Sequence, residues 1–462
     1  MTCSLFFYGF WNPAYLLLLL ASISVNYAIG YGLFKNTSKP LLLVGIAFNL
    51  ALIAYFKYAN FFVSLVADVA NASYTLQEIV LPLGISFFTF QQITWLVDTY
   101  KGNCKRYGFI DYAQFVTFFP QLIAGPIVHH HEMMPQFNKE NILASVSNNF
   151  AFGLTIFSIG LFKKVILADT MALSATPVFA AAEQGIALTL YEAWIGALSF
   201  SLQLYFDFSG YSDMAIGLAR MFGIRLPLNF NSPYKAISII DFWRRWHMTL
   251  SRFLRDYLYI PLGGNQKGKT RRYVNIAITM LLGGLWHGAG WTFIIWGAMH
   301  AAFIMINQAW RSFKPIHSSG APRNLLNRSI SQLLTLLCVV VAWVVFRAES
   351  GDAAWSMLRS MSGINGIALP AQLQSVLGSL PGLSSLSIVG FGRLFHNELV
   401  QPLSACLWIF GTGLIALGFP NTQQLINEKW KPNGLWALLI SILMLYSLLH
   451  LTQISEFLYF QF

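Results

Sequence analysis

Hydrophobic residues occur in long runs along almost the whole chain, and polar residues gather in the short stretches between them. Runs of about 20 apolar residues match the hydrocarbon thickness of a bilayer when they are helical. Clear runs cover residues 14–34, 41–66, 149–167, 188–206, 333–346, 399–417 and 435–451. Because helices satisfy their own backbone hydrogen bonds in lipid, the pattern predicts an all-α polytopic integral membrane protein. We expect roughly 10–12 membrane helices plus re-entrant and interfacial helices.

Two apolar segments carry features that disfavour full exposure to lipid. Residues 81–97 contain the adjacent polar side chains Gln91 and Gln92, so this span should not face lipid all round. Residues 112–128 are interrupted by Pro120 and Pro126, which indicates a re-entrant or kinked segment buried in protein.

Three consecutive histidines, residues 129–131, follow the proline-interrupted segment directly. Neighbouring side chains point in different directions on any regular element, so a tight metal site from these three alone is not favoured. We expect them to be solvated or interfacial, and we expect no bound metal in the protein.

Composition agrees with a membrane chain, since only 10% of the 462 residues are charged and the mean hydropathy is +0.56. Soluble domains carry about 25% charged residues. The net charge of +11 fits cytoplasmic loops facing anionic lipid better than nucleic-acid binding. The four cysteines are isolated, so they predict neither a disulfide nor a metal pattern.

The orientation follows from a few charges. Lys35 and Lys39 lie after the first span, whereas Asp68 and Glu78 lie after the second. Basic loops are cytoplasmic, so the N-terminus should be extracytoplasmic. Residues 1–13 have no basic region and no small-residue cleavage site, and we expect no removable signal peptide.

The stretch 281–301, LLGGLWHGAGWTFIIWGAMHA, is apolar for about the length of a span and yet holds His287 and His300. An ionisable side chain at membrane depth is costly and is by default a candidate functional residue. On one straight helix these two residues would point about 140° apart, at about 100° per residue. They can share a site only if Gly288–Gly290 interrupts the helix. A buried structural histidine is the plain alternative for both.

The segment 238–260 interleaves aromatic and aliphatic residues with arginines and His247. Residues 241–272 contain eight Lys or Arg and two Asp, which is +6 of the total +11. The pattern predicts an amphipathic helix at the cytoplasmic interface or funnelled into the domain. A headgroup anchor and a basic rim that attracts an anionic acyl donor both fit. Upstream, Asp207 should be paired or hydrogen-bonded, and Ser209 should either cap a helix or contact substrate.

The sequence has no GxSxG, HExxH, CxxC or GxGxxG motif in a suitable setting. One histidine that activates a hydroxyl towards a thioester, together with a polarising donor and an orienting tunnel, would be sufficient for acyl transfer.

At these residues the chain resembles the membrane-bound O-acyltransferases, and within them the branch of the bacterial alginate O-acetylase membrane subunit. The stretches that carry the resemblance cover residues 86–102, 118–127, 207–224, 229–265, 281–300 and 343–350, and the closing FLYFQF also fits. The resemblance implies a ring of spans around a central tunnel. It also implies a single domain over 1–462, with a family-like core at about 81–310.

The resemblance further implies roles for particular residues. The histidine of the WHG motif, His287, would be catalytic, and the histidine of FWRRWH, His247, would be the second functional position on the approach of the donor. The expected substrate-binding residues are Arg244, Arg245, Trp246, Arg252, Trp286, Asp207, Ser209, Asn265 and His300.

The function expected from this resemblance is acetyl transfer from a cytoplasmic thioester, such as acetyl-CoA, to an exported polysaccharide. The acetyl group would pass directly or through an extracytoplasmic partner acetyltransferase, in a bacterial cytoplasmic (inner) membrane. No cofactor would be bound, and membrane lipid, the donor and the polysaccharide would be the partners. The alternatives are a D-alanyl transferase that uses a carrier-protein thioester and a non-catalytic acyl conduit or transporter. Residues 364–387 match nothing in the resemblance.

Overall fold

The computed structural model describes residues 1–71, 79–137, 146–313, 325–370, 389–392, 402–452 and 458. The chain divides into two compact units, 1–158 with 211–229, and 159–210 with 230–462. They are called unit 1 and unit 2 below. The expected single family-type domain stays a prediction.

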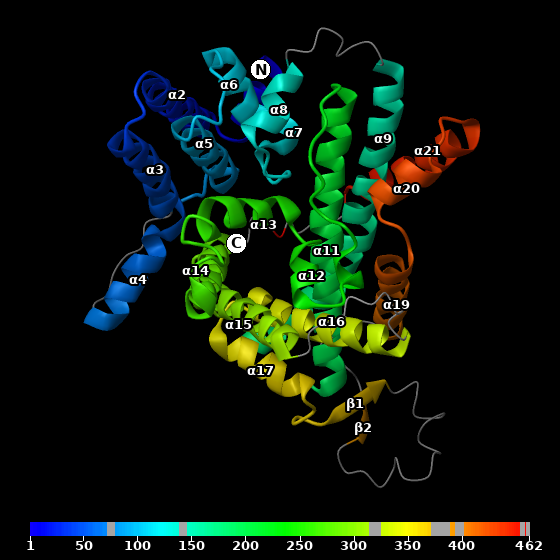
Figure 1. Ribbon diagram of the computed structural model, residues 1–462. Helices are drawn as coiled ribbons and strands as arrows, with labels where there is room; N and C mark the ends of the chain where they lie inside the picture. Colours follow the sequence, from blue (N-terminus) through cyan, green and yellow to red (C-terminus); the bar gives the residue numbers. More distant parts are fainter. Residues whose placement is uncertain are drawn as a thin grey trace. The chain divides into compact units, whose positions relative to one another are not determined.

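Unit 1 is built from short and medium helices in chain order (Figure 1). They are α1 Thr2–Trp11, α2 Pro13–Lys35, α3 Lys39–Ile53, a π-helical turn Ala54–Tyr58, α4 Ala59–Ala70, α5 Ile85–Tyr100, α6 Phe109–Thr117, α7 Phe119–Leu122, α8 His130–Phe137 and most of α9 Val146–Phe162. The end of α11, which runs from Leu190 to Met221, also belongs to unit 1.

Helix α5 lies in the interior of unit 1, as its glutamines predicted. Gln92 donates to the Ser22 hydroxyl at 3.0 Å, and the Tyr112 hydroxyl donates to the Gln92 carbonyl at 3.3 Å. The proline-interrupted segment is broken between α6 and α7 at Phe118, and its residues are mostly buried. The kinked, protein-buried segment predicted from the prolines is therefore present.

Unit 2 contains a second π-helical turn, Lys163–Ala168, followed by α10 Asp169–Glu183, the first part of α11, a 3-10 turn Pro233–Lys235, α12 Ile239–Trp243, α13 Met248–Leu254, a third π-helical turn Arg255–Tyr259, α14 Gly268–His287, α15 Trp291–Phe313, α16 Leu325–Arg347, α17 Gly351–Met361, α19 Pro402–Gly418, α20 Thr422–Lys429 and α21 Gly434–Leu449. Helices α14, α15 and α16 pack in sequence, and α17 lies against both α15 and α16 (Figure 1).

Five helical stretches among the described residues are long and apolar enough to cross a membrane, namely 13–35, 39–70, 146–183, 291–313 and 325–347. A sixth arises if the bent pair 403–418 and 422–429 is one span. The protein is thus an all-α polytopic membrane protein. Its described exception is a pair of four-residue parallel strands, β1 Ile367–Pro370 and β2 Val389–Gly392. Most of the unassigned segment 364–387 lies outside the described residues.

The apolar stretch 281–301 is not one helix. Helix α14 ends at His287, Gly288 has an extended backbone, and α15 begins at Trp291. The two helices pack closely because glycines lie at their contact. A Cβ on Gly284 would overlap the Phe293 carbonyl oxygen, and one on Gly297 would overlap the Met280 carbonyl oxygen. The interruption at Gly288–Gly290, on which a shared histidine site depended, is therefore present.

The amphipathic helix expected over 238–260 is also interrupted, so that prediction was wrong in its continuity. Helix α12 ends at Trp243, and α13 starts after His247, whose backbone is left-handed at φ 42° and ψ 52°. L-residues rarely adopt this conformation, so a regular helix cannot continue through it.

Candidate active site

Three histidines from three parts of unit 2 lie in one aromatic cluster. The His247 and His287 ring centroids are 6.5 Å apart. The Trp296 ring contacts both His287, at 5.2 Å, and His300, at 4.8 Å. The hairpin of α14 and α15 brings two of these residues together, and the turn before α13 brings the third.

His287 is the last residue of α14 and is held by rings on several sides. Trp286, Trp296 and Phe346 lie 4.9, 5.2 and 5.3 Å from its ring. All three aromatic contacts are tilted steeply, at 69° to 86°, so ring edges and faces meet as aromatic pairs prefer. His287 nevertheless remains half-buried, whereas His247 and His300 are fully buried.

His247 is buried at a strained backbone position. Its ring meets Phe208 edge-to-face at 4.7 Å and Phe230 at 6.3 Å. Burial lowers the pKa of His247 to about 3, because an apolar setting disfavours the charged imidazolium. A neutral imidazole results at physiological pH. Left-handed backbone at a non-glycine residue costs of order 1–3 kcal/mol and is concentrated at functional sites.

His300 has a defined tautomer. The Trp243 indole N–H donates to His300 Nδ1 at 3.2 Å. An indole can only donate, so Nδ1 carries no proton, and neutral His300 holds its proton on Nε2. Nε2 is buried and has no hydrogen-bond partner within the described part of the chain. His300 therefore presents an N–H group to the interior beside Trp296.

The predicted basic and aromatic residues are placed at different distances from this cluster. Trp246 is buried and stacks on Phe242 at 5.6 Å, and Trp286 touches both His247 and His287. Arg245 pairs with Asp241 at 2.9 Å. Arg244 is exposed at the end of α12, and Arg252 is partly buried on α13.

Three further predicted substrate-binding residues lie on α11 and in the turn before α14. Asp207 is buried in an ion pair with Lys164 at 2.7 Å, and Lys164 also pairs with Asp169 at 2.7 Å. The expected pairing of Asp207 is thus confirmed. Ser209 is buried two residues further along α11, and Asn265 is exposed in the turn before α14.

Sequence reasoning missed several residues that hold the cluster together. Trp343 lies 5.7 Å from Trp296 and 4.9 Å from Trp246, and Phe346 lies beside His287. Both belong to WVVFRAES on α16, a stretch noted for its resemblance but given no role. For Trp243 and Trp296, the one feature of the sequence that could have indicated a role is that both lie close to histidines along the chain.

A second polar cluster lies in unit 1 and overturns the expectation for residues 129–131. His129 and His130 are buried, and His131 alone of the three is exposed. His130 Nε2 lies 3.1 Å from Asp98 Oδ2, and its Nδ1 lies 3.4 Å from the Cys104 sulfur. The order Cys–His–Asp is that of an activated nucleophile, but burial raises the pKa of Cys104 to about 11. The thiol stays protonated at neutral pH, which disfavours nucleophilic chemistry.

The fold and the histidine cluster define a multi-pass helical membrane protein with titratable groups inside an aromatic interior. Residues 45–329 match the membrane-bound O-acyltransferase family, and the chain belongs to that family. It is therefore a membrane-bound acyltransferase.

Individual relatives refine this placement. The chain is 46% identical to the peptidoglycan O-acetyltransferase of Helicobacter pylori over 395 residues, which cover 79% of this chain and 73% of the relative. It is 38% identical to a probable alginate O-acetylase of Pseudomonas putida, covering 100% of this chain and 93% of the relative. A teichoic acid D-alanyltransferase of Lacticaseibacillus rhamnosus is 30% identical over 61% of this chain and 77% of the relative.

Proposed function

We propose that the protein is a membrane O-acetyltransferase in which His287 is the general base. It passes an acetyl group from a cytoplasmic thioester to an extracytoplasmic polysaccharide, directly or through a partner acetyltransferase. The observation that carries the proposal is the position of His287. It is the half-buried member of three clustered histidines, so it combines an enclosed setting with access for a substrate. A general base must reach the proton that it abstracts.

The reaction can be written on the residues of the cluster. His287 accepts the proton of an acceptor hydroxyl, and the hydroxyl oxygen forms a bond to the acetyl carbonyl carbon. The carbon–sulfur bond breaks, and the leaving thiolate takes the proton back from His287. His247 lies 6.5 Å away between ring centroids, beyond direct hydrogen-bond contact. It can therefore contact a substrate group held between the two rings, and being neutral it can accept or donate there.

His300 and the surrounding rings act as positioning residues in this proposal. The Trp243 N–H fixes the His300 ring, and His300 packs on Trp296, which in turn packs on His287. Placing a catalytic base within a fraction of an ångström of its working geometry contributes strongly to rate. The aromatic contacts supply that rigidity.

The acetyl group and the polysaccharide acceptor are supported by the relatives. Proteins named for O-acetylation of peptidoglycan and of alginate are similar over 79% and 100% of this chain. The D-alanyl alternative is supported by lower identity over a shorter part, 30% over 61%. Alginate-like polymers and peptidoglycan are both candidate acceptors. Membership in an acyltransferase family sets the non-catalytic conduit aside.

We place the protein in the bacterial inner membrane with its N-terminus outside. We also place the exposed Arg244 and the basic stretch 265–272, the turn before α14 with its first residues, on the cytoplasmic side, where an anionic donor arrives. Arg244 and Arg252 would guide the donor, and Asp207, Ser209 and Asn265 remain candidate substrate-binding residues.

The decisive experiment measures acetyl transfer by purified protein in lipid nanodiscs with radiolabelled acetyl-CoA. The wild-type protein should consume the donor, and His287→Gln should lose at least about 100-fold of that rate, the lower range for removing a general base. His450→Gln, at the end of α21, serves as a matched histidine control and should keep wild-type activity. Equal rates in His287→Gln and wild type would refute the assignment. If the wild type is inactive with acetyl-CoA but active with a D-alanyl carrier-protein thioester, the D-alanyl alternative replaces ours.

A further inference from the structure

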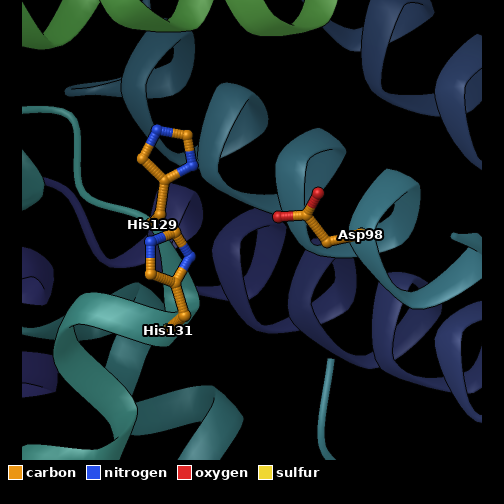
Figure 2. Close-up of side chains that lie close together, drawn as sticks. All are labelled: Asp98, His129 and His131. Carbon is orange, nitrogen blue, oxygen red and sulfur yellow. The ribbon is translucent and has the colours of Figure 1, made fainter. Parts of the chain in front are cut away.

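The turn that leads into α8 places two imidazole rings beside a carboxylate. Asp98 on α5, His129 and His131 each offer one ligand atom, and all three atoms lie within 4.8 Å of one another. Figure 2 shows the carboxylate of Asp98 pointing towards the two histidine rings. Consecutive histidines on a regular element would diverge, so the local backbone needs an explanation.

Helix capping supplies that explanation. His129 precedes the first residue of α8, and its backbone N–H donates to the Glu132 carboxylate at 3.1 Å. The Glu132 N–H donates back to the His129 carbonyl oxygen at 3.0 Å. This reciprocal arrangement fixes the helix start. The rings of His129 and His131 come to lie 5.4 Å apart and nearly parallel, at 29°, while the His130 ring is turned by 86° from that of His131.

We propose that Asp98, His129 and His131 form a binding site for one divalent transition-metal ion, with Zn²⁺ as the best match. Two imidazoles and one carboxylate are typical zinc ligands, with metal–ligand distances of about 2.0–2.2 Å. Ligand atoms around tetrahedral zinc are then about 3.4 Å apart, so the widest separation must shrink by up to about 1.4 Å. The exposed His131 can make this adjustment by side-chain rotation, and its exposure gives the ion a route of entry.

His130 supports the site as an outer partner. Its Nε2 lies 3.1 Å from Asp98 Oδ2, and a carboxylate has enough lone pairs to contact an imidazole and a metal together. Such outer partners orient the ligating group, and their loss typically lowers metal affinity about 10–100-fold. Three protein ligands leave room for at least one water. The ion would tie the end of α5 to the start of α8 across the proline-interrupted segment between them.

The test is equilibrium dialysis of the full-length protein, in nanodiscs and with a histidine-free affinity tag, against Zn²⁺, followed by elemental analysis. Wild-type protein should retain one Zn²⁺ per chain, and Co²⁺ should give the visible absorption of a low-symmetry site. His131→Gln and Asp98→Asn should each lose the ion, and His130→Ala should weaken it about 10–100-fold. His450→Gln, a change of the same kind outside the cluster, should bind as the wild type does.

A second measurement, of thermal unfolding, tests whether the variants are folded. Zn²⁺ should raise the melting temperature of the wild type and His450→Gln but not of His131→Gln, whose melting temperature in metal-free buffer should match the wild type. Because His131 is exposed, its replacement should not disturb the interior. Equal zinc content in the wild type and His131→Gln, or a wild type that retains no zinc, would overturn the proposal. Neither outcome bears on the role of His287.

Discussion

The contact between α14 and α15 offers the sharpest test of how the fold positions the site. Gly297 faces the backbone of α14 directly. An added Cβ would overlap the Met280 carbonyl oxygen and would lie 3.1 Å from both Leu281 Cα and the Met280 carbonyl carbon. Carbon atoms in good contact are about 3.5–4.0 Å apart. Since the opposing atoms are backbone, Gly297→Ala must push the two helices apart by roughly 1 Å.

The expected magnitudes follow from that displacement. Overpacking of this kind typically costs about 1–3 kcal/mol of folding free energy. The larger effect should be on catalysis, because Trp296 precedes Gly297 and contacts His287. A misplacement of about 1 Å in an active site can lower the rate about 100-fold. Gly297→Ala should therefore fold with a lower melting temperature and lose far more activity than stability.

A matched control lies in the same hairpin. At Gly290 an added Cβ would meet its nearest neighbour, a Phe293 ring carbon, at 3.4 Å, which is ordinary contact. Gly290→Ala should therefore keep both rate and melting temperature. The assay is acetyl transfer in nanodiscs with thermal unfolding of the same samples. If Gly297→Ala performs as well as Gly290→Ala in both measurements, the close backbone contact does not position the site and the reasoning fails.

Three further predictions follow from buried polar groups. The pKa of His247 is lowered in the folded protein to about 3 from an ordinary 6.5, so the unfolded chain binds more protons between these values. Stability should fall as the pH drops from 6.5 towards 3, and melting curves of His247→Asn should show a smaller fall. Lys164→Met should lower stability by about 3–5 kcal/mol, because it leaves Asp207 and Asp169 buried without their shared cation. Adding Asp207→Asn should recover part of that loss in detergent melts, and no recovery would argue against the ion pair. Asn49→Leu should cost about 0.6–1.7 kcal/mol in the same assay, because Asn49 and Asn26 exchange amide hydrogen bonds at 2.6 and 3.3 Å between α2 and α3. An unchanged melting temperature would show that this pair contributes nothing.

Apolar run length predicted several of the membrane spans, because hydrocarbon thickness acts on each helix separately. Among the described residues, five stretches, or six with the bent pair, meet the length and composition of a span, against the roughly 10–12 expected. The runs 14–34, 41–66 and 333–346 correspond to helices 13–35, 39–70 and 325–347. The interior position of α5 was also predictable, since Gln91 and Gln92 would be costly in lipid. Whether an apolar stretch forms one continuous helix or two could not be predicted. The stretch 281–301 is apolar apart from its two histidines, and three non-helical residues, 288–290, separate α14 from α15.

Part of the site was predictable for a different reason. His287 and His247 stand in short motifs that the resemblance carries, so their importance did not depend on knowing the fold. That His247 and His287 lie close together could be known only from the fold, because no helical or strand periodicity relates residue 247 to residue 287. The tautomer of His300 could not be predicted without knowing where Trp243 lies, because the two residues are 57 positions apart in the sequence. The burial of His129 and His130 was not predicted, because it depends on how the chain enters α8, where the His129 N–H donates to the Glu132 carboxylate.

Glycine in the WHG motif has a physical reason that links the helix break to the site. Gly288 has φ −159° and ψ 153°, an extended conformation that any residue can adopt, so backbone freedom is not what requires glycine there. Space is what requires it, because a Cβ would overlap the Phe293 ring. That ring packs on Phe346 at 5.1 Å, and Phe346 packs on His287 at 5.3 Å. The absence of a side chain after His287 thus lets α15 return close enough for its first turn to support the rings that hold His287.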